Sequence, residues 1–118
     1  VASAEAPTSV SFDHEGHIDW SRSAQEIERL IRAFNPWPGT FTDLGEQRIR
    51  IHQASALKQG SDKGPGTVIA RERDGVDVAC GTGTLRITSA QLPGSKAQSI
   101  NDLINGGKQV LLPGQELN

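Results

Sequence analysis

The chain has 118 residues, of which 22% are charged and 35% hydrophobic, and its formal net charge is −2. This length suits one domain with a modest core, and the acidic balance argues against a dedicated nucleic-acid binder acting alone. Cys80 is the only cysteine, which excludes an internal disulfide and fits a reducing, cytoplasmic compartment. We expect no membrane span and no metal site, because no apolar run is long enough and no thiol or histidine cluster has ligand spacing.

Residues 1–16 have the composition of a linker. They are rich in Ala, Ser and Glu, contain Pro7 and show no sustained hydrophobic period. His14 and His17 lie in and beside this stretch, and we interpret them as solvated loop side chains rather than metal ligands. A chain that starts with a linker is typical of a piece of a longer protein, and we place the folded domain at residues 17–118.

An amphipathic helix is expected to begin after Ser23. Ser23 and Glu26 have the spacing of a capping box, in which each residue bonds the backbone N–H of the other. Asn35-Pro36 ends the helix, because the residue before a proline is pushed out of the α region. The apolar residues at helical spacing are Ile27, Leu30, Ile31 and Phe34.

Two tryptophans flank this helix. Pro36 and Pro38 hold Trp37 on a stiff, extended support, whereas Trp20 precedes the helix. Two interpretations are open: both indoles cover the core of this domain, or one of them faces a partner domain. Trp20 and Trp37 are therefore candidate anchors of the core or of an interdomain contact.

Short strands joined by hairpin turns are expected after the helix. In the longest of them Arg48 and Arg50 alternate with Ile49, so the arginines point away from the apolar face. Asp74-Gly75 predicts a type I′ hairpin turn, whose two central residues need positive φ. The expected strands span residues 40–44, 47–58, 67–73, 76–80 and 84–92.

The end of the chain predicts one more helix and one more strand. Pro93-Gly94 is expected to end the sheet, and Ser99 with Asp102 repeats the capping-box spacing for a short helix. Residues 110–112 are expected to form a last strand. The order of elements predicts a mainly β fold with short helices, specifically an OB-like Greek-key β-barrel preceded by one amphipathic helix.

Two motifs near the first helix are distinctive: I-D-W-S-x-S-A-x-x-I from residue 18 and I-R-A-F-N-P-W-P-G at 31–39. They resemble the C-terminal domain of the methionyl-tRNA formyltransferases, within the folate-dependent formyltransferase family. The likeness covers nearly everything after Gly16. It continues through A-S-A-L at 54–57, P-G-T-V at 65–68, G-T-G-T-L at 81–85, S-I-N-D-L-I-N-G at 99–106 and V-L-L-P-G at 110–114.

The resemblance implies that residues 1–16 lead from an N-terminal, Rossmann-like catalytic domain. That domain would bind 10-formyltetrahydrofolate and carry an Asn-His-Asp constellation. Neither motif is present in this chain, so we expect no catalytic residue and no cofactor here. The resemblance also implies that the barrel helps to hold initiator methionyl-tRNA, mainly through its backbone phosphates, and we expect a monomer.

The resemblance is carried over to single residues at two positions. Arg50 stands where the family commonly has a lysine or arginine, and Lys96 matches one member of a basic pair whose other place holds Ser95. Arg48 and Arg86 are added because strand alternation turns them outward on strands that we expect to be neighbours. The predicted tRNA-phosphate-binding residues are Arg48, Arg50, Arg86 and Lys96.

Other functions have weaker support. His52 and Cys80 fall on different strands with no paired acid, so we expect no Cys-His nucleophile and interpret Cys80 as a small buried hydrophobe. With few aromatic residues, a stacking platform for single strands is poorly supported. The alternative to a tRNA-binding domain is a structural or substrate-gating domain of another folate-dependent formyltransferase, acting on a nucleotide sugar or an amino acid. The acidic balance favours this alternative, and the F-N-P-W-P motif favours tRNA.

Overall fold

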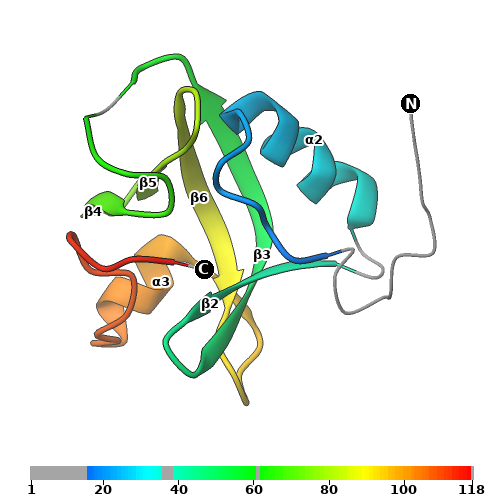
Figure 1. Ribbon diagram of the computed structural model, residues 1–118. Helices are drawn as coiled ribbons and strands as arrows, with labels where there is room; N and C mark the ends of the chain where they lie inside the picture. The colour runs from blue at the N-terminus through cyan, green and yellow to red at the C-terminus, as the bar shows by residue number, and fades with distance from the viewer. Residues whose placement is uncertain (1–15, 36–38, 61, 118) are drawn as a thin grey trace.

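The computed structural model describes residues 16–35, 39–60 and 62–117, and it confirms a mainly β fold with short helices (Figure 1). Trp37 and most of residues 1–16 lie outside the described residues. The OB-like Greek-key topology stays a prediction. In chain order the elements are α2 (Ala24–Phe34), β2 (Thr40–Leu44), β3 (Gln47–Leu57), β4 (Val68–Glu72), β5 (Gly75–Ala79), β6 (Thr84–Gln91), β7 (Ala97–Ser99) and α3 (Ile100–Asn105).

The strands form one antiparallel sheet in the order β2-β3-β6-β5-β4, with β7 paired to β6. The long strands β3 and β6 are central, although they are far apart in the sequence (Figure 1). Their register shifts at His52 and Gln53, which indicates a bulge. Helix α2 packs on β3 and β6, whereas α3 lies near the C-terminal segment and contacts β5, β6 and β7.

Helix α2 has the predicted bounds, and local chemistry sets its start. The Ser23 hydroxyl accepts from the backbone N–H of Glu26 at 3.1 Å, and the Glu26 carboxylate accepts from the N–H of Ser23 at 3.2 Å. These bonds satisfy two of the N–H groups that a helix start leaves open. Ile27 and Ile31 are buried on the face toward the sheet.

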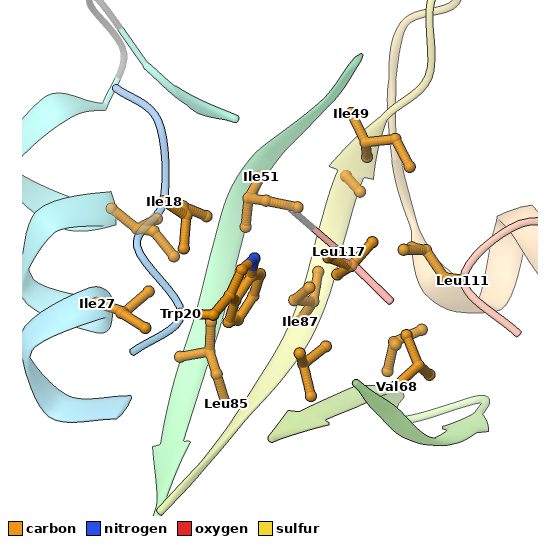
Figure 2. Close-up of a cluster of buried hydrophobic side chains, with 14 of the residues drawn as sticks. Ile18, Trp20, Ile27, Ile49, Ile51, Val68, Leu85, Ile87, Leu111 and Leu117 are labelled. Carbon is orange, nitrogen blue, oxygen red and sulfur yellow. The ribbon is translucent and has the colours of Figure 1, made fainter. Parts of the chain in front are cut away.

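Trp20 is a core residue, with 5% of its surface exposed. Its indole stands between Ile27 of α2 and Ile87 of β6 (Figure 2). The indole N–H donates to the hydroxyl of Thr42 on β2 at 2.9 Å, so the polar atom of this buried ring is satisfied. Trp20 therefore ties the segment before α2 to both the core and the sheet.

The hairpin between β4 and β5 lies where it was predicted, but its turn differs. Glu72 pairs with Gly75, so the two turn residues are Arg73 and Asp74. Leu111 is the one non-glycine with positive φ among the described residues, so neither of them has the type I′ conformation. Gly75 is needed for another reason: a Cβ there would lie 2.6 Å from the carbonyl oxygen of Ile87 on β6.

Two predictions about the end of the chain were wrong. The sheet does not end at Pro93-Gly94, because β7 pairs with β6 after the turn. Residues 110–112 form no strand; instead, residues 114–117 run beside residues 66–68, joined by backbone hydrogen bonds of 2.7–2.9 Å. Leu111 has φ 56 and is 1% exposed, so the chain turns sharply there to bury this side chain.

A candidate nucleic-acid interface

The candidate interface begins with two arginines on the outer face of β3. Ile49 and Ile51 of this strand are 0% and 2% exposed, because their side chains enter the core. Strand alternation then turns Arg48 and Arg50 to the opposite, exposed face. The two cations are thus on one side of the sheet.

Arg48 is held in place by two contacts on β2. Its guanidinium carbon lies 4.0 Å from the centre of the Phe41 ring, and its Nε donates to the Asp43 carboxylate at 3.3 Å. His17 also stacks on Phe41, with ring centres 5.0 Å apart, and its Nε2 lies 3.8 Å from Asp43. His17 is therefore packed rather than simply solvated, and the Arg48 guanidinium is restrained before any ligand binds.

A surface depression of about 390 Å³ lies beside these arginines, between the β2–β3 turn and the β6–β7 turn. We call it the arginine hollow. One wall is basic and comes from β3, while the other comes from residues 91–94, at the end of β6 and in the β6–β7 turn. Its lining residues are Glu46, Arg48, Arg50, Gln91, Leu92, Pro93 and Gly94.

Lys96 is exposed and follows this turn, immediately before β7. Arg50 pairs with Gln91 across β3 and β6, and Gln91 pairs with Ala97 across β6 and β7. Adjacent strands are about 4.8 Å apart, so the backbones of Arg50 and Ala97 are separated by roughly 10 Å. The sheet therefore places the backbone next to Lys96 two strands away from Arg50, although the two residues are far apart in the sequence.

Arg86 has a different environment from the other predicted cations. Its Nε and one terminal nitrogen donate to the Asp77 carboxylate at 2.8 and 3.2 Å. These bonds raise the pKa of the Arg86 guanidinium, and the charges of Asp74 and Glu72 act in the same direction. Arg86 pairs with Ser55, five residues along β3 from Arg50, so the structure does not bring it to the arginine hollow.

Two features of the hollow were not predicted from the sequence. Gln91 lies between the arginines and the turn and bonds to both sides, and Phe41 supports Arg48. Gln91 lies beside Arg50 because of the register between β3 and β6, and no local pattern in the sequence reveals that register. The contact of Phe41 with Arg48 depends in the same way on the pairing of β2 with β3.

The described residues offer little chemistry for catalysis. Burial raises the pKa of the Cys80 thiol to about 11, which disfavours the reactive thiolate. His52 bonds Gln91 rather than an acid. Within residues 16–35, 39–60 and 62–117, no three His, Cys, Asp or Glu side chains gather as a metal site would require. None of the helices described is both long and apolar enough to cross a membrane.

The sequence of the chain is similar to that of one known protein family. Residues 12–108 match the family described as "Formyl transferase, C-terminal domain". The chain is 47% identical over 108 residues to a methionyl-tRNA formyltransferase of Idiomarina loihiensis, covering 87% of this chain and 34% of that protein. It is 53% identical over 103 residues to a methionyl-tRNA formyltransferase of Hahella chejuensis, covering 87% of this chain and 32% of that protein. The chain thus spans about a third of the length of these relatives.

Proposed function

Since the chain belongs to the formyl transferase C-terminal domain family, we propose that it is the tRNA-contacting domain of a methionyl-tRNA formyltransferase. In this proposal an N-terminal catalytic domain of the same protein binds 10-formyltetrahydrofolate and transfers the formyl group to initiator methionyl-tRNA. The C-terminal domain adds binding energy and holds the tRNA in place. The protein would act in translation initiation, in the cytoplasm.

The arginine hollow with the adjacent Lys96 is the observation that supports a role in tRNA binding. Arg48 and Arg50 line the hollow, and Lys96 follows the turn that forms its other wall. Glu46 is the one acidic residue in the lining, so the local balance is basic although the whole chain is acidic. Guanidinium groups bind phosphate through paired N–H donors, and lysine adds a mobile point charge.

Arg86 is left out of this proposed contact set. Its guanidinium already bonds Asp77, and the carboxylates of Asp74 and Glu72 add negative charge nearby. A phosphate at that position would meet this negative charge and would have to compete with Asp77 for the guanidinium. Arg48 also has a carboxylate partner, but its side chain is 56% exposed and borders the open hollow.

Binding through phosphates has a measurable signature. Each neutralised phosphate releases counterions, so about three contacts give a slope of log affinity against log salt near −2 to −3. Nonspecific dissociation constants are typically ~10⁻⁴–10⁻⁶ M, and an acidic domain acting alone should bind at the weak end of that range. The affinity of the isolated chain for tRNA should therefore be modest and should fall steeply with salt.

The test compares two charge reversals of equal size. Arg50→Glu with Lys96→Glu changes the proposed contact set, whereas Arg29→Glu with Lys108→Glu changes exposed cations outside the hollow. Fluorescence anisotropy with labelled initiator tRNA should show strongly weakened binding and a flatter salt slope for the first pair only. Equal losses for both pairs would mean that net charge, and not this surface, governs binding.

The same titration separates the second candidate function. If initiator tRNA does not bind even at low salt, the proposal of a tRNA-contacting domain is contradicted. The chain would still belong to the same family, but its role would be structural or substrate-gating. The parent formyltransferase would then act on a nucleotide sugar or an amino acid.

A further inference from the structure

The side chain of Gln91, which lines the arginine hollow, connects β3 to the β6–β7 turn. Its amide Nε2 donates to the carbonyl oxygen of Ser95 at 2.8 Å, which fastens the β6–β7 turn. Its Oε1 then faces Nε2 of His52 on β3, at 2.9 Å. Because an amide oxygen only accepts, the ring of His52 must carry its proton on Nε2 to donate this bond.

The β6–β7 turn, to which Gln91 is hydrogen-bonded, is short and exposed. Ser95 donates its N–H to the carbonyl of Leu92 at 3.1 Å, and Gly94 has φ 75, a conformation that side chains rarely adopt. The residues from 93 to 97 are all exposed, so little packing holds the turn against β3. Lys96 comes directly after Ser95, and its direction therefore depends on how this turn is fixed.

We propose that Gln91, supported by His52, is the positioning residue of a phosphodiester-binding subsite in the arginine hollow. The chain of hydrogen bonds from His52 through Gln91 to Ser95 holds the turn so that Lys96 and Arg50 face the same phosphates. Gln91 is uncharged and acts through Lys96 and not by its own contact with RNA. This inference rests on the proposed function, because it assumes that the phosphates belong to tRNA.

Pre-organisation is the physical reason for such a residue. A lysine side chain has many rotamers, and ordering it on binding costs free energy that a fixed backbone partly removes. If the turn is released, Lys96 samples positions away from the hollow and neutralises a phosphate for less of the time. A neutral substitution at Gln91 should therefore change the salt dependence of binding, which loss of packing alone would not do.

The experiment is a double-mutant cycle on the 118-residue chain, with labelled initiator tRNA as the probe and anisotropy as the readout. The variants are Gln91→Met, Lys96→Ala and the two together. Gln53→Met is the matched control, because Gln53 is an exposed glutamine on β3 and the substitution is the same as at Gln91. Lys96→Ala should reduce the magnitude of the salt slope by about 1. Gln91→Met should reproduce much of that reduction, and the double variant should resemble Lys96→Ala.

Each outcome separates the two claims. If Lys96→Ala binds like the unchanged chain, the proposed contact set fails. If Lys96→Ala weakens binding but Gln91→Met behaves like Gln53→Met, or if the two losses simply add, the contact set stands and the positioning role is refuted. Should Gln91→Met not fold, His52→Phe removes only the donor to Gln91, and a salt slope unchanged in that variant contradicts the inference.

Discussion

Replacing Trp20 tests how the segment before α2 is joined to the sheet. The indole is 5% exposed and lies in the core cluster, so Trp20→Ala removes a large buried side chain and should cost about 3–5 kcal/mol. Trp20→Phe keeps part of the ring but loses the 2.9 Å hydrogen bond to Thr42. A net hydrogen bond is worth about 0.5–1.5 kcal/mol, and the lost ring volume brings the expected cost to roughly 1–3 kcal/mol.

The contribution of the hydrogen bond itself comes from a second cycle. Thr42→Val removes the hydroxyl while nearly keeping the shape of a side chain that is fully buried. If the Trp20–Thr42 bond stabilises the fold, the losses of Trp20→Phe and Thr42→Val should not add. The interaction free energy should be about 0.5–1.5 kcal/mol.

Urea unfolding followed by far-UV circular dichroism measures these differences without relying on tryptophan fluorescence. With a slope of about 1–3 kcal/mol/M, the Trp20→Ala midpoint should fall by about 1 M or more. A midpoint for Trp20→Ala within error of the unchanged chain would refute a core role for this indole. Additive losses in the cycle would refute a stabilising hydrogen bond while leaving the packing argument intact.

Four further predictions concern the fold and its chemistry. Ser23→Ala removes the N-cap hydroxyl of α2 and should lower the free energy of unfolding by about 1 kcal/mol in the same urea assay. The backbone hydrogen bond from Ser23 lowers the pKa of Glu26 below 4.5. The stabilisation by the Glu26 carboxylate is therefore present above pH 4.5 and is lost as the pH falls through the folded pKa. The difference in melting temperature between the unchanged chain and Glu26→Gln should accordingly shrink in acid. Cys80, with its pKa raised to about 11, should react with a thiol reagent at pH 8 only after unfolding in urea, and rapid labelling of the native chain would contradict its burial. Gly81→Ala places a Cβ against the carbonyl oxygen of Ser21 and should destabilise by roughly 2–4 kcal/mol, whereas Gly60→Ala, with open space around it, should be nearly neutral.

Local signals in the sequence were sufficient for α2 and for the position of most strands. Ser23, Glu26 and the apolar spacing of the helix are all properties of neighbouring residues, so the helix has the predicted bounds. Contacts between distant residues were not visible in this way. From the sequence we predicted Gly75 as a turn residue. In the structure a glycine is required there because β6 passes so close that a Cβ would not fit.

The same distinction between local signals and long-range contacts applies to the candidate site. Alternation along one strand correctly turned Arg48 and Arg50 outward. Whether two cations on different strands meet depends on register, which here means the pairing of β3 with β6 and of β6 with β7. For this reason the sequence could not show that Arg86 bonds Asp77, or that Gln91 connects His52 to the turn before Lys96.

In the proposed function, this domain contacts tRNA through the arginine hollow and Lys96. The most direct measurement is a titration of the ¹⁵N-labelled chain with initiator tRNA at low salt, followed by amide chemical shifts. We predict that the largest shifts fall at residues 46–50 and 91–96 and that they disappear as salt is raised. Shifts confined to α2 or the β4–β5 hairpin, or no shifts at all at low salt, would contradict the claim.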